Sequence, residues 1–335
     1  MKRDTLLRSF LRTTDWRNSE PVLLAGDASN RTYFRVQEAN GTCAVIMDAP
    51  PEKGEDIRPF IDVTQRLRLS GFSAPNIYAS DPEHGFLILE DLGDDLFAQV
   101  LRTDTTQETE FYQTAVDLLV ELHTAPETSS GLAPYDQATC LREAQLITNW
   151  YLPAASGPVS QDCDAEYADV ISTLCADLMP DQPVLVMRDY HAENLLWLPE
   201  RSALERIGLL DYQDALAGHP AYDLVSLLED ARRDISATLQ ADMLAHYITT
   251  TGIAADSFRR AYAILGAQRN LKILGIFARL SKRDHKPIYI DHMPRVWGYL
   301  QNDLRHPALA DLKSWVDQYL PEPTAAIREK LAAQE

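Results

Sequence analysis

The chain has 335 residues and is acidic, with 50 Asp and Glu against 31 Lys and Arg and a formal net charge of −19. This surplus of negative charge would repel a polyphosphate backbone, which excludes nucleic acid as an expected partner. A hydrophobic content of 45% over this length is sufficient for two packed units and excludes a largely disordered chain.

The cysteines and the N-terminal residues indicate the cellular compartment that we expect. The four cysteines are scattered without a C-x-x-C pair, which argues against a zinc site and a disulfide framework. The first 16 residues contain leucines, but Arg8 and Arg12 interrupt them, so the pattern predicts an amphipathic helix rather than a signal peptide. No segment approaches about 18 uninterrupted apolar residues. We therefore expect a cytoplasmic protein without a membrane partner.

The first third of the chain predicts a small β-rich unit. Residues 21–36 read as strand, turn and strand, with the turn beginning at Gly26. Residues 43–47 form a further strand, and residues 55–70 have apolar residues at roughly helical spacing. The apolar run at 86–89 is the last predicted strand of this unit.

The remainder of the chain is dominated by helical patterns. Residues 107–123 carry an apolar stripe that is typical of a central packing helix, and residues 257–280 predict a long helix. Within the second helix, Arg269 and Asn270 interrupt the apolar pattern. Both could bind a sugar or could lie on the exposed helix face, and the pattern alone favours neither interpretation.

The segment 183–214 carries the strongest functional signal. Asp189, Asn194 and Asp211 occur at the spacing used in phosphoryl transfer: R-D-x-x-x-x-N is half of the kinase catalytic loop, in which Asp accepts the substrate proton and Asn binds magnesium. Asp211 takes the second metal position, and apolar runs around these residues predict short strands. Turn residues at hairpin ends would explain the residue types. They would not explain the spacing.

Two motifs in this segment, D-Y-H-x-x-N at 189–194 and L-D-Y-x-D-A at 210–215, resemble the signature of the aminoglycoside phosphotransferase and choline kinase superfamily. The resemblance implies an α+β, two-lobed, protein-kinase-like fold. The small β-rich N-lobe would span residues 1–91 and bind the nucleotide. The larger, mostly helical C-lobe would span residues 92–335 and carry the catalytic loop, metal site and acceptor-binding helices.

The resemblance also implies roles for individual residues. Asp189 would be the catalytic base, with His191 buttressing its loop and Arg188 preceding it in the motif. Asn194 and Asp211 would ligate Mg²⁺, and the nucleotide would be ATP.

The nucleotide-binding residues are expected in the first lobe. In the family, a Gly-x-x-Ser turn cradles phosphate, and the segment after the strand at 86–89 is the hinge that binds adenine. Met47 occupies the position at which protein kinases carry a phosphate-binding lysine, so we expect Arg31 or Arg35 to supply the positive charge. The candidate nucleotide-binding residues are Gly26, Ser29, Asn30, Arg31, Arg35, Glu90 and Leu92.

A closer resemblance, to the bacterial anomeric kinases of cell-wall sugar recycling, covers nearly the whole chain. It implies a small-molecule acceptor, with phosphate transfer to the C1 hydroxyl of N-acetylmuramate and N-acetylglucosamine. Asp214, Arg269 and Asn270 are the candidate acceptor-binding residues. The segments that carry the resemblance are M-D-A-P-P at 47–51, L-E-D-L-G-D at 89–94, G-H-P-A-Y-D-L at 218–224 and Q-R-N-x-x-I-L-G-I-F-A-R-L at 268–280.

Residues 259–295 concentrate positive charge in this acidic chain, with nine Lys and Arg against Asp284 and Asp291. The segment could bind an anionic acceptor group such as the lactyl carboxylate of N-acetylmuramate. It could equally be a solvated helix face with salt bridges to the acidic surplus, which is the more common origin of such a pattern.

Two further functions compete with a sugar kinase. A kinase for an amine-bearing acceptor, such as an aminoglycoside or choline, would benefit from the negative charge of the chain. A nucleotide-binding regulatory module without turnover is suggested by Met47 at the lysine position. The presence of Asp189, Asn194 and Asp211 together argues against the module, because binding alone does not require all three.

Overall fold

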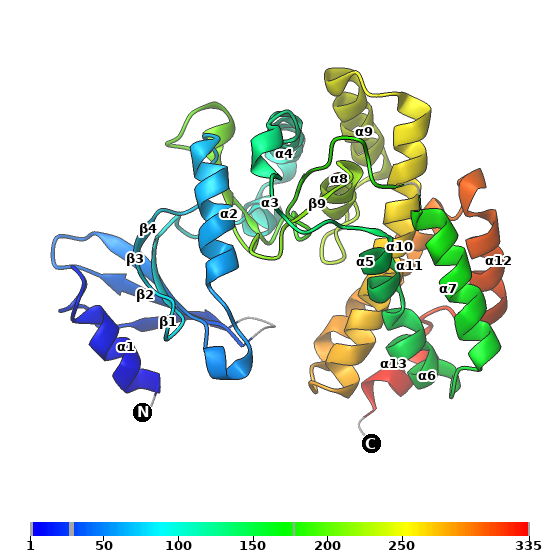
Figure 1. Ribbon diagram of the computed structural model, residues 1–335, viewed down its shortest axis with the longest axis horizontal. Helices are drawn as coiled ribbons and strands as arrows, with labels where there is room; N and C mark the ends of the chain where they lie inside the picture. Colours follow the sequence, from blue (N-terminus) through cyan, green and yellow to red (C-terminus); the bar gives the residue numbers. More distant parts are fainter. Residues whose placement is uncertain (1–2, 27–29, 177, 334–335) are drawn as a thin grey trace. The chain divides into compact units, whose positions relative to one another are not determined.

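The computed structural model describes residues 3–26, 30–176 and 178–333. Two compact units are formed by internal contacts (Figure 1). We call them the N-terminal unit and the C-terminal unit. The first contains Met1–Phe111 and Glu193–Ala215, and the second contains Tyr112–Ala192 and Leu216–Glu335.

The N-terminal unit is built on a five-stranded antiparallel sheet with the strand order β1-β2-β3-β5-β4. The strands predicted within 21–36 and at 43–47 and 86–89 are all present. The five strands are β1 (Val22–Gly26), β2 (Thr32–Gln37), β3 (Cys43–Asp48), β4 (Ile77–Asp81) and β5 (Phe86–Glu90).

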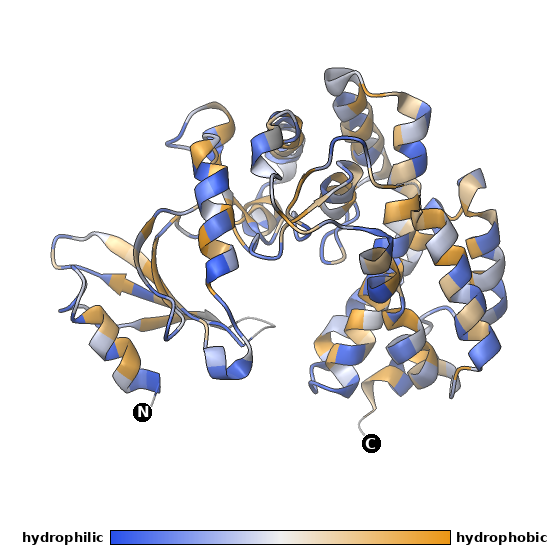
Figure 2. Ribbon diagram, viewed as in Figure 1, coloured by the Kyte–Doolittle hydropathy of each residue, from blue (hydrophilic) through white to orange (hydrophobic). Residues whose placement is uncertain are grey.

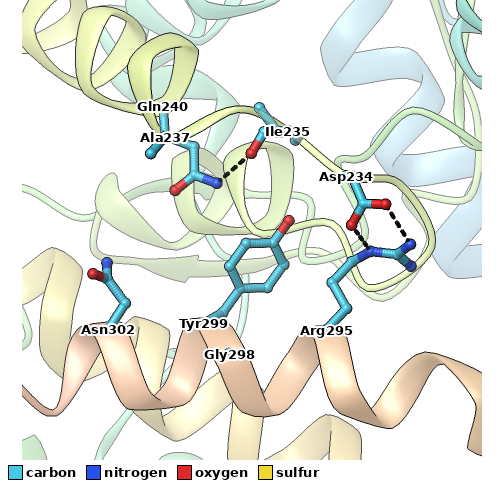
Figure 3. Close-up of a pocket in the computed structure, with 8 residues that line it drawn as sticks. All are labelled: Asp234, Ile235, Ala237, Gln240, Arg295, Gly298, Tyr299 and Asn302. Atoms are coloured by element: carbon cyan, nitrogen blue, oxygen red, sulfur yellow. Dashed lines mark hydrogen bonds and ion pairs between the residues drawn. The ribbon is translucent and has the colours of Figure 1, made fainter.

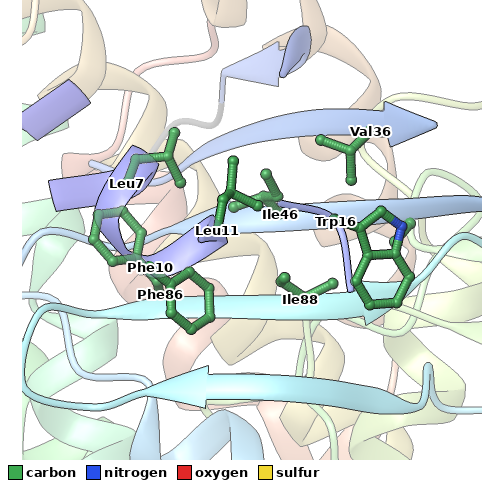
Figure 4. Packing of buried hydrophobic residues seen from close by; sticks show 9 residues of the cluster. Leu7, Phe10, Leu11, Trp16, Val36, Ile46, Phe86 and Ile88 are labelled. Atoms are coloured by element: carbon green, nitrogen blue, oxygen red, sulfur yellow. The ribbon is translucent and has the colours of Figure 1, made fainter. Parts of the chain in front are cut away.

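One face of this sheet is covered by α1 (Arg3–Leu11). The helix is amphipathic, as the sequence predicts, and its apolar residues meet those of the strands in one buried cluster (Figure 4). The ring of Phe10 stacks on that of Phe86 with centroids 5.6 Å apart. The cluster contains Leu7, Phe10, Leu11, Trp16, Val36, Ala44, Ile46, Phe86 and Ile88.

The opposite face of the sheet carries the residues that alternate with this cluster. Tyr33 pairs with Met47 and Arg35 pairs with Val45 across β2 and β3, and directly paired residues share a face. Met47, which stands at the lysine position of protein kinases, is therefore on the face that does not pack against α1. Its exposed fraction is only 2%.

Helix α2 (Arg58–Leu69) confirms the helix predicted within 55–70 but begins three residues later. Proline lies in its first turn, where its fixed φ is compatible with a helix start. The carboxylate of Asp56 accepts the backbone N–H of Arg58 at 3.0 Å, which stops the helix from extending further back. Hydrophobic and hydrophilic residues are interleaved along α2 (Figure 2). Its buried residues are Phe60, Val63, Thr64 and Leu67.

A β-hairpin completes the N-terminal unit. Strand β7 (Leu195–Trp197) pairs with β8 (Ile207–Leu209), and Trp197 stacks on Phe111 with ring centroids 4.2 Å apart. Helix α3 (Phe97–Thr103) adds the ring of Phe97 to this aromatic group. Part of the chain beyond residue 92 thus packs with the sheet, and the division into lobes at that residue stays a prediction.

The C-terminal unit is mostly helical and includes the two-stranded sheet of β6 (Val184–Val186) and β9 (Leu216–Gly218). Its helices are α4 (Glu108–His123, which begins in the other unit), α5 (Gln137–Ala144), α6 (Leu152–Ser156), α7 (Gln161–Cys175), α8 (Ala221–Leu228), α9 (Ala237–Thr251), α10 (Ala255–Lys282), α11 (Met293–Asp303), α12 (Ala310–Tyr319) and α13 (Ala325–Ala332). Short 3₁₀ helices lie at Pro51–Lys53, Thr105–Gln107, Pro126–Thr128, Ala203–Arg206, Pro287–His292 and Pro307–Leu309, and a π-helical turn lies at Ile147–Tyr151.

Helix α10 is the central element of this unit and confirms the long helix predicted at 257–280. It contacts α5, α8, α11 and the π-helical turn, so it is buried on several sides. Arg269 and Asn270 have exposed fractions of 5% and 0%. Placing these two residues on an exposed helix face is therefore wrong, because neighbouring helices cover that side of α10 as well.

No helix in the described ranges is both long and apolar enough to span a membrane. The four cysteines, Cys43, Cys140, Cys163 and Cys175, are free thiols.

Candidate functional site

The β7–β8 hairpin brings the two predicted metal ligands to one end of the N-terminal unit. Leu195 pairs with Leu209, and the N–H of Leu210 donates to the carbonyl oxygen of Asn194 at 3.0 Å. Asp211 follows directly. Two short apolar runs thus fold back on each other and place an amide and a carboxylate at the same hairpin end.

Asp211 has an unusual backbone conformation, with φ at 57°. Non-glycine residues rarely adopt this left-handed region, and such strain is concentrated at functional positions. Its Oδ1 accepts a hydrogen bond from Gln213 Nε2 at 2.8 Å and faces Arg31 Nη1 at 3.4 Å. The side chain is 34% exposed, so part of the carboxylate is open to a further ligand.

The donor set at this hairpin end fits Mg²⁺. Carboxylate and amide oxygens are hard ligands, and Mg²⁺ in phosphoryl-transfer sites takes one or two protein ligands plus water and substrate phosphates. Nowhere in the described chain do three or more His, Cys, Asp or Glu residues gather as a metal cluster. Asn194 and Asp211 therefore suit an ion that is completed by a nucleotide rather than a self-contained structural metal.

Arg31 is held beside this pair by Glu55, a residue that the sequence analysis missed. Arg31 Nε lies 2.9 Å from Glu55 Oε2, and the backbone N–H of Asn30 donates to Glu55 Oε1 at 3.1 Å. The side chains of Arg31 and Glu55 are 12% and 13% exposed. The acid at the start of the predicted helix was the available signal, because protein kinases pair their lysine with a helix glutamate.

Gly26, Ser29 and Arg35 are further residues that the sequence predicts to bind the nucleotide. Gly26 is the last residue of β1, and Ser29 lies outside the described residues. Arg35 pairs with two carboxylates that follow β5: its Nε lies 2.7 Å from Asp91 and its Nη2 lies 2.8 Å from Asp94. Arg31, rather than Arg35, is thus the arginine in contact with a metal-ligand candidate.

The segment after β5, predicted as the hinge, borders a pocket of about 410 Å³. Glu90 is fixed at the end of β5, where its carboxylate accepts from Asn76 at 2.9 Å and pairs with Arg201 at 2.6 Å. Leu92 lines the pocket itself. The lining residues are Asp91, Leu92, Asp95, Trp197, Leu198, Pro199, Glu200 and Arg201.

The predicted catalytic loop lies in the C-terminal unit, directly after β6. Arg188 has a left-handed backbone, with φ at 73°. The buried carboxylate of Asp223 accepts the N–H groups of Met187 and Arg188 at 2.7 and 2.8 Å. Burial raises the pKa of Asp223 to about 7, and these two hydrogen bonds oppose the rise. Asp223 thus braces the backbone at the start of the catalytic loop.

Asp189 is an exposed residue of this loop, whereas Tyr190 and His191, which follow it, are buried. The surrounding protein acts to raise its pKa, but nearby positive charges, led by Lys272 and including Arg269 and Arg188, bring the pKa below the ordinary value. Asp189 is thus ionised at neutral pH and open to solvent, as a base that takes a hydroxyl proton must be.

His191 is buried two residues further on, with an exposed fraction of 5%. Burial lowers its pKa to about 4, so the imidazole is neutral at physiological pH. Its Nε2 lies 3.3 Å from Nη1 of Arg232. A neutral, enclosed ring is suited to supporting the loop rather than to exchanging protons with a substrate.

The three acceptor candidates have different surroundings. Asp214 is exposed and belongs to the N-terminal unit. Arg269 donates to the hydroxyl of Ser226 at 2.9 Å, and that hydroxyl donates to the carbonyl of Arg188 at 3.0 Å. Arg269 thereby supports the catalytic loop from α10.

The third acceptor candidate, Asn270, lies between two buried carboxyl groups. Its Nδ2 donates to Glu229 at 2.7 Å and to Asp303 at 3.0 Å. The amide hydrogens of Asn270 are therefore occupied within the protein.

A second pocket, of about 290 Å³, lies in the C-terminal unit (Figure 3). Arg295 of the basic segment lines it and forms a two-pronged ion pair with Asp234, with Nη2 to Oδ2 at 2.9 Å. Arg283 pairs likewise with Asp284. Salt bridges thus account for part of the basic segment. The pocket is lined by Asp234, Ile235, Ala237, Gln240, Arg295, Gly298, Tyr299 and Asn302.

Comparison with known proteins adds three findings. A model of the "Phosphotransferase enzyme family" matches residues 21–262. A protein of Caulobacter vibrioides named N-acetylmuramate/N-acetylglucosamine kinase is 35% identical over 96% of this chain and 98% of its own length. A protein of the same name from Pseudomonas aeruginosa is 35% identical over 92% of each chain.

Solved structures with the same fold are more distant in sequence. A choline/ethanolamine kinase family protein from Mesorhizobium loti has a TM-score of 0.60 at 16% identity and covers 94% of this chain and 99% of its own. An ADP-bound aminoglycoside phosphotransferase has a TM-score of 0.55 at 14% identity and covers 89% and 96%. Similarity at this level of sequence identity shows the fold and does not indicate the substrate.

Proposed function

Because the chain belongs to the phosphotransferase enzyme family, we propose that it transfers the γ-phosphate of ATP to the C1 hydroxyl of N-acetylmuramate and N-acetylglucosamine. The observation that carries the proposal is the 35% identity over 96% of the chain to a kinase named for these two sugars. Relatives named in the same way from other bacteria align over most of the chain. The chain is accordingly a kinase that acts on a hydroxyl group, and the two sugars are its proposed acceptors.

The N-terminal unit supplies the nucleotide-binding groups in this proposal. Asn194 and Asp211 would hold Mg²⁺, which would offset the negative charge of the nucleotide phosphates. Arg31, fixed by Glu55 at 2.9 Å, would supply the cation that is missing at Met47. Glu90 and Leu92 would present backbone groups to adenine, and Gly26, Ser29, Asn30 and Arg35 complete the proposed nucleotide-binding set.

The C-terminal unit supplies the base. The carboxylate of Asp189 takes the proton of the acceptor hydroxyl while that oxygen forms a bond to the γ-phosphorus. The bond from phosphorus to the β,γ-bridging oxygen breaks, and ADP leaves with the electron pair. No covalent enzyme intermediate is required, so positioning and charge neutralisation account for most of the acceleration.

Acceptor recognition is assigned to three residues. Asp214 is exposed and can accept hydrogen bonds from sugar hydroxyls. Arg269 and Asn270 are buried among polar partners, so their proposed contribution is to shape and fix the acceptor side of the C-terminal unit.

A kinase for amine-bearing acceptors is the second candidate. The net charge of −19 would attract a cationic acceptor such as an aminoglycoside or choline. Bulk charge is a property of many unrelated acidic proteins, whereas the identity to the sugar kinases covers nearly the whole chain. A nucleotide-binding module without turnover is not retained, because the relatives that align over this length are named as kinases.

Mg²⁺-dependent transfer of labelled phosphate from ATP tests the proposal with a panel of N-acetylmuramate, N-acetylglucosamine, kanamycin and choline. We expect an acid-labile sugar phosphate from the first two acceptors. Asp189→Asn should lower kcat by a factor of about 10²–10⁴, the usual contribution of general base catalysis. Asp169→Asn, an exposed acid on α7, is the matched control. Transfer to kanamycin or choline alone would overturn the proposed acceptor.

A further inference from the structure

The carboxylate of Glu143 connects the catalytic loop to helix α10. Glu143 lies on α5, and α5 packs against α10 in the C-terminal unit (Figure 1). Its Oε1 forms an ion pair with Nη2 of Arg188. Its Oε2 lies 2.9 Å from Nζ of Lys272 and accepts the hydroxyl of Tyr135 at 2.6 Å. One carboxylate thus holds a residue of the loop and a residue of the central helix.

These groups are enclosed by the protein. The side chains of Glu143, Lys272 and Arg188 are 10%, 12% and 19% exposed. The ammonium of Lys272 also donates to the hydroxyl of Tyr222 at 3.2 Å. The carboxylate of Glu143 and the ammonium of Lys272 therefore each have two polar partners, as buried charges require.

The charges of the cluster do not cancel internally. Arg188 and Lys272 contribute two positive charges, and Glu143 contributes one negative charge. A buried cation without compensation is unfavourable. The carboxylate of Asp189, which follows Arg188 in the chain, carries the opposite charge, and Lys272 lowers its pKa more than any other charged group does. Stability alone gives little reason for such a cluster, since apolar replacements of buried ion pairs are often neutral or stabilising.

We propose that Lys272 and Glu143 are positioning residues of the phosphoryl-transfer reaction: they fix Arg188 and so hold Asp189 in its working position beside the acceptor. The inference rests on the proposed role of Asp189 as the base. It adds a second support to the loop, independent of the two backbone hydrogen bonds to Asp223. Glu143 acts through Arg188, and Lys272 acts through Glu143 and through its charge near Asp189.

Steady-state kinetics of Lys272→Met, Glu143→Gln and the double variant test this inference, with whichever acceptor of the panel the wild type phosphorylates. We expect Lys272→Met to lower kcat by about 10–100-fold, the cost of a small misplacement of a catalytic group, while KM for ATP stays within about threefold. Because the two residues act through one network, the double variant should be no slower than the slower single variant.

Lys313→Met is the matched control, since Lys313 is a half-exposed lysine that pairs with Asp317 on α12; its kcat should equal that of the wild type. Tyr135→Phe serves if Lys272→Met does not fold. It removes only the hydroxyl that donates to Glu143 and should lower kcat by about threefold to tenfold at unchanged KM for ATP.

Different results would reject the proposed function and the positioning role of Lys272 and Glu143. Wild-type activity on amine acceptors only would reject the proposed sugar function and leave the kinetic comparison intact. A kcat of Lys272→Met within twofold of the wild type, a loss confined to KM, or single effects that multiply in the double variant would overturn the positioning role.

Discussion

At the scale of single residues, Arg31 is the proposed phosphate-binding cation with the best-defined surroundings. Its guanidinium faces Glu55 at 2.9 Å and Asp211 at 3.4 Å. Met47 cannot supply a charge, so we propose that the pair of Arg31 and Glu55 takes the role that a lysine and a glutamate have in protein kinases. A guanidinium is always charged and presents several donors in a fixed plane, which suits phosphate oxygens.

We therefore expect Arg31→Met to raise KM for ATP by about tenfold or more, the loss of one charged hydrogen bond of about 1.5–3 kcal/mol. Arg31→Lys should keep part of the affinity, because it retains the charge but not the planar geometry. Initial rates at varied ATP concentration measure both effects. Arg102→Met, an exposed arginine on α3, is the control. An unchanged KM for Arg31→Met would assign the phosphate cation to another residue.

The buried pair of Glu229 and Asp303 predicts a pH dependence of stability. Burial is the main reason that the pKa of Glu229 rises to about 7, and burial followed by the charge of Glu229 raises the pKa of Asp303 further. In the unfolded chain both groups release their protons near pH 4. Between about pH 5 and 7 the folded state therefore binds more protons than the unfolded state, and stability falls as pH rises.

Chemical denaturation at several pH values tests this sign. The contribution of Glu229 should lower the free energy of unfolding by up to about 1.4 kcal/mol per pH unit between pH 5 and 7, the linkage slope of one proton. Glu229→Gln keeps the size and an acceptor for Asn270 and should remove the contribution of Glu229, while that of Asp303, whose pKa is raised mainly by burial, remains. Asp169→Asn, at an exposed site, should keep both contributions. A stability that rises equally with pH in wild type and Glu229→Gln would contradict the protonated pair.

At the scale of elements, the sequence predicted the features that depend on local patterns better than the contacts between residues far apart in the chain. The strand at 86–89, the long helix and the hairpin around Asn194 and Asp211 follow from apolar periodicity and from turn chemistry, which act over a few residues. Glu143 and Lys272 are 129 positions apart in the chain, and nothing local connects them. The same limit explains Arg269: the sequence shows that it interrupts an apolar stripe, but only packing shows that α8 provides its partner Ser226.

Helix α10 illustrates how one glycine sets the distance between elements. A Cβ added at Gly275 would lie 2.4 Å from the carbonyl carbon of Leu146 and 2.7 Å from the backbone nitrogen of Ile147. Backbone atoms cannot move aside as a flexible side chain can. The π-helical turn is therefore able to approach α10 closely only because residue 275 has no side chain.

Gly275→Ala should destabilise the protein by about 1–3 kcal/mol, because the cost of overpacking exceeds the gain of about 1 kcal/mol in helix propensity. Gly298 in α11 provides an internal control, since a Cβ there would meet no atom within 4 Å. Gly298→Ala should stabilise by about 0.5–1 kcal/mol. Urea denaturation of both variants measures the contrast. Stabilisation by both substitutions would show that the turn at Leu146 yields.

At the scale of the whole molecule, the predicted α+β, protein-kinase-like fold is confirmed by the solved structures that share it. The two sequence motifs indicated that fold because the spacing of Asp189, Asn194 and Asp211 requires short paired strands around them. The acceptor side was less predictable. Asp214, Arg269 and Asn270 are predicted to bind the acceptor because their side chains can form hydrogen bonds with a sugar. The residue type does not show that the amide of Asn270 already donates to Glu229 and Asp303.

The different roles proposed for Asp211 and Asp189 predict how each residue affects the stabilisation of the protein by a bound nucleotide. A ligand that binds only the folded state at 100 times its Kd adds about 2.7 kcal/mol, which for a chain of 335 residues corresponds to about 4 °C in Tm. Asp211 is proposed to hold the metal that bridges the phosphates, whereas Asp189 is proposed to touch only the acceptor. Loss of Asp211 should therefore remove stabilisation by the nucleotide, and loss of Asp189 should not.

Thermal unfolding with ADP and Mg²⁺ separates these roles without turnover. We expect the same rise in Tm for the wild type and Asp189→Asn, and little or none for Asp211→Asn or after chelation of the metal by EDTA. Asp169→Asn reports any general effect of removing one negative charge from this acidic chain. A full rise in Asp211→Asn would mean that the nucleotide binds without the proposed ligand pair, and a rise lost in Asp189→Asn would place that residue at the nucleotide rather than at the acceptor.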